Sequence, residues 1–468
     1  MSDRRPRPVL VLLTSHWLSM TGAAMVTFAA FSEIFLLLSG PRAHPENPYI
    51  GLLTAFLIPI IFFTGLILIP IGIRLGRQRA EGLFLSEETK ARAWRRTGIF
   101  FAVMTVLNLI IGSQLSFHAV EAMDSVSFCG QTCHVMKPEF TAHLSPSHQS
   151  VSCSECHIAP GAAGFVKAKL AGTRQLVSVV FDNFPRPIES GLESNRLVSS
   201  ELTCEGCHAR QKPLGSVLKI IPKFADDESN TRTNTVLMML TGGSTSGGIH
   251  GAHLKPGLHI RYSAQDKKRD MIPWIEVRHD SGETVSYLSK DVKADAVKDL
   301  PVFDMQCADC HNRASHSFEL PERAMDKSIA EGNIPGDLPF LKKTGLELLK
   351  ANYESQDEAA QKIASGLSAF YQQKYPAISA QRAGDIQKSA TELTAIYQRN
   401  VFPDLKVTWG TYANNLGHTD ATGCFRCHDD NHVNAEKKTI TQDCGACHNV
   451  VAVDEKSPEA LKALGLTK

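Results

Sequence analysis

The 468-residue sequence predicts a membrane protein with three N-terminal transmembrane helices and an exported domain that is mostly helical or irregular and contains a small β element. Three observations predict this class. Three apolar segments lie within the first 120 residues. The loops that join them differ in their content of basic residues. Beyond them, all twelve cysteines occur as closely spaced pairs, and a histidine follows every pair.

Each apolar segment reaches the roughly 20 residues that an α-helix needs to cross a bilayer. The segments are residues 9–38, 49–73 and 97–117. The first is too long for a cleaved signal peptide, whose apolar part spans roughly 7–15 residues. The second contains Pro59 and Pro70, and because proline lacks a backbone N–H, we expect this helix to be kinked.

Basic residues indicate the orientation of these helices. The N-terminus and the loop between the second and third segments are rich in arginine and lysine, whereas the first loop contains only Arg42. Lysine and arginine are enriched in cytoplasmic loops. The N-terminus is therefore expected in the cytoplasm, and the third helix is expected to lead the chain out of it at His118.

The cysteine pairs match the attachment pattern of haem c. Five of the six pairs read C-x-x-C-H, and no cysteine is left over. Zinc sites do not require a histidine after every second cysteine, and disulfides would leave the histidines unexplained. C-x-x-C-H is typical of covalent haem attachment, so we expect six haems c. The attaching cysteines are Cys129, Cys133, Cys153, Cys156, Cys204, Cys207, Cys307, Cys310, Cys424, Cys427, Cys444 and Cys447. The proximal iron ligands are His134, His157, His208, His311, His428 and His448.

One pair, Cys129 and Cys133 in FCGQTCH, has three residues between the cysteines instead of two. Both sulfurs must reach one side of a flat ring, so both must lie on one face of a helical turn. At about 3.6 residues per turn, positions i+3 and i+4 both return to that face. The wider spacing is therefore compatible with haem, with His134 next to the second sulfur.

The cysteine pairs and the basic residues predict the same topology. Covalent haem attachment takes place outside the cytoplasm. The protein is therefore expected in a bacterial inner (cytoplasmic) membrane, with its N-terminus in the cytoplasm and its haem domain in the periplasm. A formal net charge of +1 gives no indication of nucleic-acid binding.

Low-spin, electron-carrying haems need a second axial ligand, which is histidine or methionine. Histidines beside attachment motifs or beside flexible glycines are the candidates, and a surface position is the alternative for each. They are His148, His316, His418, His432 and one of the two histidines in GIHGAH, His250 or His253. The spacing does not indicate which haem each would serve, because distal ligands often come from elsewhere in the chain.

Regular structure outside the motifs is expected in two places. Residues 257–290 alternate apolar and polar side chains around a DSGE turn, which predicts short strands. Residues 337–400 show helical periodicity and many strong helix formers, which predicts helices. The rest has few regular signals, as expected where porphyrin forms much of the core.

Segment 118–210 resembles the NapC/NirT family of membrane-anchored multihaem quinol dehydrogenases. The matching features are Met136 two residues after His134, the Ser-x-His that contains His148, and the sequence CHIAPG. The resemblance implies that Met136 ligates the first haem. Three helices and an extended haem domain look more like the inner-membrane multihaem cytochromes of metal-reducing bacteria.

Four regions follow from these features. Residues 1–118 form a three-helix membrane anchor, and residues 119–210 form a NapC/NirT-like triple-haem region. Residues 211–300 form a linker region with short strands, and residues 301–468 form a C-terminal three-haem region with a helical insert.

The function expected first is oxidation of membrane quinol, with electrons passed through the haems to a periplasmic cytochrome or reductase. The alternative is an electron-relay subunit of a larger membrane complex without its own quinol site. A homo-oligomer is also compatible with the sequence. A nitrite reductase is disfavoured, because such enzymes commonly use a C-x-x-C-K site and this chain has none.

The quinol site is expected at the outer membrane face, between the outer ends of the first and third helices and the first haem. Quinol oxidation releases protons, so ionisable groups are needed there. Glu33 lies inside the first apolar segment, where an ionisable side chain is costly. The other candidates are His118, Glu121, Asp124 and Lys137. Solvated ion pairs are the alternative for each of them.

Overall fold

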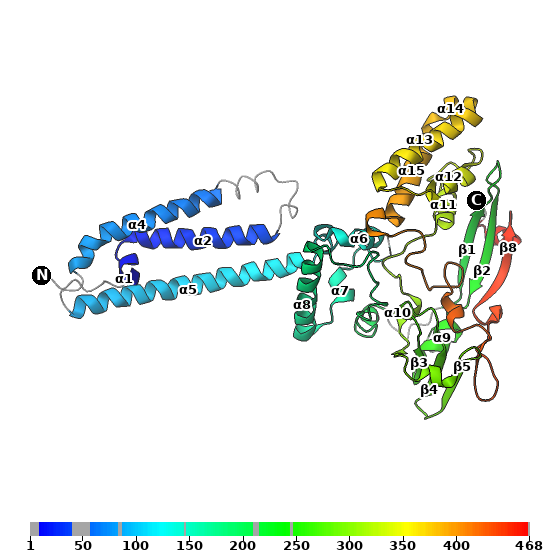
Figure 1. The fold of residues 1–468 in the computed structure, drawn as a ribbon, viewed down its shortest axis with the longest axis horizontal. Coiled ribbons are helices and arrows are strands. Elements are labelled where there is room, and N and C mark those ends of the chain that lie inside the picture. The colour runs from blue at the N-terminus through cyan, green and yellow to red at the C-terminus, as the bar shows by residue number, and fades with distance from the viewer. Residues whose placement is uncertain are drawn as a thin grey trace. The chain divides into compact units, whose positions relative to one another are not determined.

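The computed structural model describes residues 9–39, 57–82, 87–144, 147–208, 215–243 and 247–466. The chain divides into two compact units, Met1–Phe128 and Cys129–Lys468. Figure 1 shows the elements of both units.

The first unit consists of helices α1 (Val9–Leu13), α2 (Trp17–Ser39), α4 (Ile58–Gly82) and α5 (Glu87–Met123). The segment predicted as one helix over 9–38 is thus broken. His16 stands at the break and caps α2, because its Nδ1 accepts a hydrogen bond from the Leu18 backbone at 3.2 Å. Stretches Ile58–Arg77 and Glu88–Gln114 are long and apolar enough to cross a membrane, whereas the apolar stretch of α2, Trp17–Ser32, is shorter.

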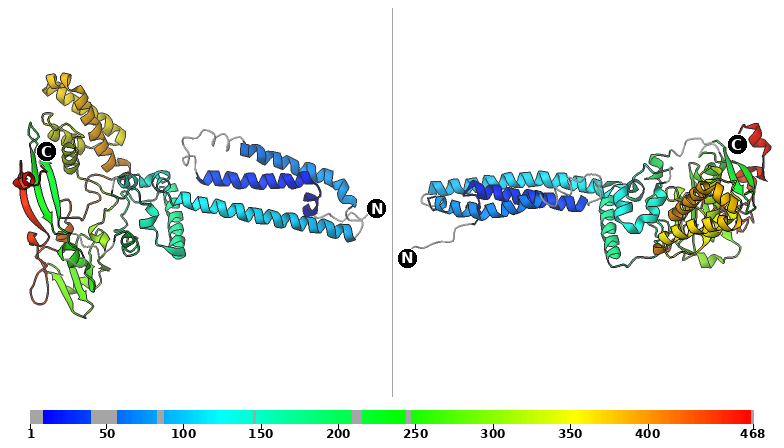
Figure 2. Two further views of the ribbon diagram at one scale, coloured as in Figure 1. Left: turned by 180° about the vertical axis from the view of Figure 1, so that it is seen from behind. Right: turned by 90° about the horizontal axis from the view of Figure 1, so that it is seen from above.

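Helices α2 and α4 pack through small residues, and Figure 2 shows them side by side. A Cβ on Gly22 would lie 2.7 Å from the Gly65 carbonyl oxygen, and a Cβ on Gly72 would lie 2.2 Å from the Ser19 nitrogen. Backbones this close leave no room for larger side chains. Packing of this kind is typical of helix pairs in membranes.

The ends of α4 and α5 differ from the prediction. Pro59 lies in the first turn of α4, where a missing N–H costs little, whereas Pro70 lies inside the helix. Helix α5 has 37 residues and is therefore about 55 Å long. It exceeds the roughly 30 Å hydrocarbon core of a bilayer, so its last turns, including His118, extend beyond the apolar stretch.

The described residues of the second unit form two antiparallel sheets. The predicted strands in 257–290 are confirmed as β3, β4 and β5, in a sheet of order β6-β3-β4-β5-β7. In the three-stranded sheet of order β1-β2-β8, β1 and β2 form a hairpin within 211–300, where short strands were expected. Strand β8 was not predicted to join them, because it comes from a distant part of the sequence. The strands are β1 (Val217–Phe224), β2 (Arg232–Met239), β3 (Leu258–Ser263), β4 (Trp274–His279), β5 (Thr284–Ser289), β6 (Val302–Asp304), β7 (His432–Val433) and β8 (His448–Glu455).

The predicted helices within 337–400 are also confirmed, and they enclose the largest apolar core of the unit. Leu341, Leu349, Ile363, Leu367 and Leu393 are fully buried in it. The helices of this region are α11 (Pro321–Ala330), α12 (Leu341–Lys350), α13 (Gln356–Lys374), α14 (Pro376–Gln381) and α15 (Ala383–Asn400). Further short helical elements are η5 (Ala294–Val297), η6 (Pro403–Leu405) and α16 (Glu459–Ala463).

Candidate haem-binding site

Every cysteine pair lies in or beside a short helical turn. In three motifs the histidine backbone N–H donates to the carbonyl of the first cysteine, at 2.8 Å for His208, 2.8 Å for His311 and 3.1 Å for His428. Both sulfurs and the histidine therefore come from one turn of chain, as haem attachment requires. The turns are η2 (Phe128–Thr132), α7 (Cys153–His157), η4 (Cys204–Gly206), α10 (Cys307–Cys310), η7 (Gly423–Arg426) and η8 (Cys444–Ala446).

The first motif accommodates its extra residue in a π-helical turn. Element η2 is a π-helix, and it is followed by η3 (His134–Met136), a short 3-10 helix. Hydrogen bonds in a π-helix span five residues instead of four, so one turn takes in one more residue. The wider turn can therefore keep Cys129 and Cys133 on one face despite the three-residue gap.

Five proximal histidines each face a second histidine at the spacing of a shared iron. With metal–nitrogen bonds of about 2 Å, two imidazoles on opposite sides of one iron have ring centroids about 6 Å apart. The observed centroid distances are 6.2 Å for His157–His316, 6.1 Å for His208–His148, 6.3 Å for His311–His250, 5.8 Å for His428–His253 and 6.2 Å for His448–His418. These residues fit bis-histidine haem.

Hydrogen bonds orient several of these rings. In each case Nδ1 contacts a backbone carbonyl, which directs the other nitrogen, Nε2, away from that bond and leaves it for iron. The bonds run from His148 to Ala314 (3.1 Å), His253 to Ile249 (2.7 Å), His316 to Glu139 (2.9 Å) and His428 to Thr441 (2.9 Å).

The two GIHGAH histidines belong to different pairs. Only one of them was expected to be a ligand. Helix α9 (Gly248–Leu254) instead places His250 against His311 and His253 against His428. The three-residue spacing of the two histidines on a helix was the signal for this arrangement, because it puts both on one face.

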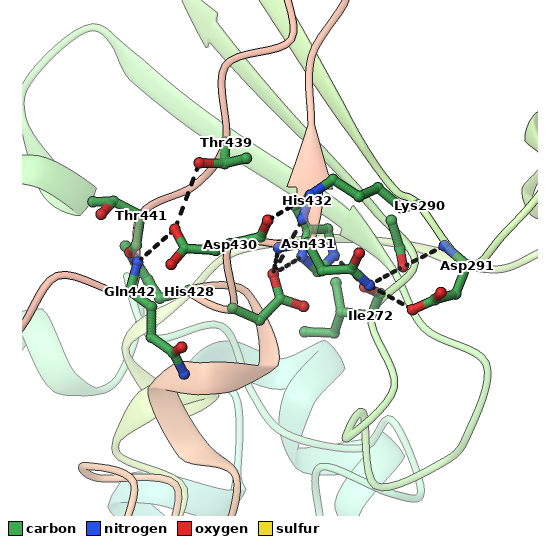
Figure 3. A network of polar contacts seen from close by, with 12 residues as sticks. Ile272, Lys290, Asp291, His428, Asp430, Asn431, His432, Thr439, Thr441 and Gln442 are labelled. Carbon is green, nitrogen blue, oxygen red and sulfur yellow. Dashed lines mark hydrogen bonds and ion pairs between the residues drawn. The ribbon is translucent and has the colours of Figure 1, made fainter.

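The structure argues against His432 as a haem ligand. Figure 3 shows its surroundings, and its side chain is buried. Its Nδ1 lies 2.8 Å from the Asp429 carboxylate, and its Nε2 lies 2.6 Å from the Ile272 carbonyl. Since both ring nitrogens are hydrogen bonded, neither is available to iron. Position next to the CFRCH motif was a misleading signal here.

His143 was not predicted, yet it lies beside a ligand pair. Its ring centroid is 6.1 Å from that of His316, and its Nδ1 is 2.6 Å from the Ser315 hydroxyl. Its Nε2 is buried without a hydrogen-bond partner among the residues that the structure describes. His143 therefore lies as close to His316 as His157 does and is a further candidate ligand in this group of three rings. Its place in the sequence TAH, outside any motif, gave no indication of this.

The first motif differs from the others. His134 and Met136 both lie in η3, and no histidine ring faces His134 at the pair spacing in the described part of the chain. Met136 is half-buried, whereas His134 is exposed. This difference is compatible with the methionine ligation that the family resemblance implies.

The candidate quinol-site residues lie in both units. Glu33 belongs to α2, in a part whose side chains lie outside the described residues. In α5, His118 Nδ1 lies 3.3 Å from the Glu121 carboxylate, and Asp124 follows the end of this helix. Lys137, in α6 (Lys137–His143), donates to the Gln356 side chain at 3.1 Å.

Sequence reasoning missed Glu139, also in α6. Its carboxyl group is largely buried, and burial raises its pKa, although the nearby Arg313 guanidinium partly offsets this effect. One carboxyl oxygen, Oε2, has no hydrogen-bond partner among the described residues. Nothing in the local sequence KPEF marks this glutamate as buried.

Interactions between the motifs connect the first three in order. A hydrogen bond from Cys129 lowers the pKa of the Cys153 thiol to about 7. Burial raises the pKa of Cys156, and the neighbouring Cys204 thiol adds to this shift. Motifs one and two, and motifs two and three, are therefore direct neighbours.

The last three motifs continue the series. Burial lowers the pKa of His311, and the nearby rings of His250 and His208 lower it further, so motif four adjoins motif three. Burial raises the pKa of Cys310 to about 11, with a contribution from Cys424 of motif five. The pKa of Cys447 in motif six is raised by burial and then by Cys424.

Apolar membrane-type helices, haem-type cysteine turns and facing histidines together define a membrane-anchored multihaem cytochrome c, a protein that transfers electrons. Residues 92–217 match the family model described as the NapC/NirT cytochrome c family, N-terminal region. The chain is also 36% identical over 417 residues to the cytochrome c-type protein ImcH of Geobacter sulfurreducens, over 87% of this chain and 82% of that protein. The chain therefore belongs to the NapC/NirT cytochrome c family. No solved structure matches it.

The comparisons confirm the family that segment 118–210 resembles. Covalent haem c follows from that membership, and the cysteine turns and facing histidines fit it. When bound, haem c supplies one-electron redox chemistry. The chain supplies attachment, axial ligands and the spacing between neighbouring sites.

Proposed function

We propose that this chain oxidises membrane quinol at the outer face of the inner membrane and passes the electrons through six haems c to a periplasmic cytochrome or reductase. The observation that most supports this is the short connection from membrane helix to haem motif. Helix α5 ends at Met123, and the first attaching cysteine is Cys129. The few residues between them span at most about 20 Å, which keeps the first haem within reach of the membrane quinone pool.

Oxidation of a quinol to a quinone releases two electrons and two protons, so the site needs proton acceptors as well as haem. The His118–Glu121 pair lies on the turns of α5 beyond its apolar stretch, and Asp124 follows directly. Imidazole and carboxylate side chains are groups that can accept a proton in such a reaction. We assign proton acceptance to this group, with Glu33 as the candidate from α2.

Helix α8 (Gly161–Val180) supports a location of the haem unit at the membrane surface. Val166, Leu170, Val177 and Val180 lie on one face of it and are exposed. Its charged residues are Lys167, Lys169 and Arg174, and it contains no acidic residue. A basic helix with an exposed apolar face is typical of helices that lie in the lipid headgroup region.

The order of the motifs supports electron transfer along the sequence. Each motif adjoins the next, from the Cys129–Cys153 contact to the interaction of Cys424 with Cys447. Electrons from quinol would enter at the first motif, which is nearest to α5 in the sequence. They would leave at the sixth motif, whose His448 begins β8 at the other end of the series.

The test is quinol-driven haem reduction in the Glu33→Gln, Asp124→Asn and Lys137→Ala variants. Dithionite reduction reports intact haems, and Glu436→Gln, in an exposed pair with Lys438, is the matched control. We expect at least one variant to reduce its haems about tenfold more slowly with quinol, at an unchanged dithionite endpoint. Normal quinol rates in all three would remove the proposed site.

The second candidate function is an electron-relay subunit without its own quinol site. A purified chain that takes no electrons from quinol, but takes them from a co-purifying quinol-oxidising partner, would establish it. Such a result would leave the haem series unchanged, because the relay needs the same motifs.

Met136 is proposed as an iron ligand of the first haem. Methionine ligation raises the potential of a haem relative to histidine ligation. The Met136→Leu variant should therefore shift one haem potential and alter the spectrum of one haem. Spectra and potentials identical to those of the parent would exclude this role.

A further inference from the structure

One turn of helix faces two haem motifs at once. In α9, His250 and His253 are three residues apart and lie on the same face. The ring of His250 is 6.3 Å from that of His311 in motif four, and the ring of His253 is 5.8 Å from that of His428 in motif five. Two haems ligated by these rings would therefore be neighbours.

A buried polar network joins the same two motifs. Asp309 lies between the cysteines of motif four, and Arg426 lies between those of motif five. Arg426 donates to the Asp309 carbonyl at 2.6 Å and to the Arg269 carbonyl at 3.1 Å. Arg269 in turn donates to the Asp309 carboxylate at 3.1 Å. The three residues are between 4% and 8% exposed, so these charges have little access to water and depend on one another.

We propose that motifs four and five hold a rigid haem pair, in which α9 supplies both distal ligands, His250 and His253, and the Asp309–Arg269–Arg426 network fixes the distance between the two haems. The proposal requires haem at these two motifs, which is part of the proposed function. It does not require quinol oxidation.

The two members of the pair should differ in their magnetic spectra. The His250 and His311 ring planes are 15° apart, whereas those of His253 and His428 are 65° apart. Near-parallel imidazoles on ferric iron give a rhombic low-spin spectrum, and near-perpendicular ones give a spectrum dominated by one large g value. Two ferric ions this close also broaden each other's signals.

The test uses electron paramagnetic resonance and redox titration of the full chain with the variants His250→Met and His253→Met. We expect His250→Met to alter a rhombic signal and His253→Met to alter a large-g signal. Each variant should raise the potential of one haem, and a different haem in each case. The control is His259→Met, at a half-exposed histidine paired with Asp280, which should change neither property. A denaturing mass measurement confirms an unchanged haem count.

Two results would overturn the ligand assignment. One is a variant with the parent spectrum and potentials. The other is that both variants change the same haem, which would make the two histidines alternatives at one iron. If either variant fails to assemble, the parent protein provides the test. Its resonance signals are recorded fully oxidised and again after one of the haems has been reduced. If the remaining signals do not sharpen, the two haems are not a close pair.

Arg426→Gln tests the positioning role, because it leaves all four histidines in place. We expect six haems and both low-spin signals, with the mutual broadening lost or reduced. If the network contributes only to stability, the variant will unfold at a lower midpoint and keep the broadening of the parent. That outcome would exclude the network as the feature that fixes the distance between the haems. No arm measures quinol oxidation, so a failed quinol site and a failed haem pair are distinguishable.

Discussion

Two regions of the second unit are stabilised in different ways. The helical region α11–α15 encloses a core of aliphatic and aromatic side chains, in which Ile363 and Leu393 have no exposed surface. The region 129–208 holds three motifs, and none of the residues of α7, α8 or η4 is buried. In α8, Leu170 is 65% exposed. The difference shows that the chain provides its own apolar core in the first region and much less of one in the second.

The largest expected effect comes from preventing haem attachment in the second motif. The double variant Cys153→Ser, Cys156→Ser removes a ring that we expect to supply much of the missing core. Residues 129–208 should become accessible to protease, while 321–400 stays protected. Limited proteolysis with mass mapping measures this, and Cys444→Ser, Cys447→Ser serves as the comparison in a motif outside the region. Equal protection of both regions in the Cys153→Ser, Cys156→Ser variant would contradict the proposed difference between them.

A cavity in the helical core should have a smaller effect and leave the haems unaltered. Leu393→Ala should lower the free energy of unfolding of this region by roughly 2–5 kcal/mol, through lost burial and the cavity left behind. Denaturant unfolding followed by hydrogen exchange measures the loss, and haem absorbance is the control. A haem spectrum that changes as much as the exchange rates would mean that the two regions share one core.

Removing a buried amide should have a more moderate effect on the same region. The Asn230 side chain donates to the Gly336 and Leu338 carbonyls at 3.0 and 2.7 Å and accepts from the Lys342 backbone at 2.8 Å. Asn230→Ala leaves these groups buried without partners, at a cost on the order of 1–3 kcal/mol. Asn333→Ala, at an exposed amide that bonds Glu331, should be neutral. Equal unfolding midpoints for the two variants would refute the assigned role.

The smallest effect is expected at the exposed ion pair between Arg382, which lies between α14 and α15, and Asp337 in the loop before α12. The Arg382 guanidinium, which makes two 2.8 Å bonds to the Asp337 carboxylate, lowers the pKa of Asp337 below its ordinary value of about 3.9. A carboxyl group whose pKa is lowered in the folded state stabilises the protein at pH values above its ordinary pKa. This stabilisation is lost as the pH falls through the lowered pKa of the folded state. Arg382→Gln should therefore cost less than about 1 kcal/mol at pH 7 and almost nothing near pH 2, because the pair is exposed. An undiminished difference at low pH would rule out the ion pair as the cause.

Attachment motifs and apolar segments were readable from the sequence, because each depends on residues close together in the chain. Cys153, Cys156 and His157 lie within one turn, and the apolar residues of α4 and α5 form continuous stretches of sequence. Strands β3–β5 and the helices of 337–400 were predicted for the same reason, since periodicity is local. The break at His16 was not predicted, because the apolar run of 9–38 continues through it.

Only the tertiary structure decided which histidines face one another. His316 lies next to motif four in the sequence, yet its ring faces His157 of motif two, and α9 serves two motifs rather than one. His432 met the same criterion of adjacency and is held by Asp429 and Ile272 instead. An axial ligand is defined by which side of a ring it approaches. That approach depends on how distant segments of the chain pack together, so it cannot be predicted from the local sequence.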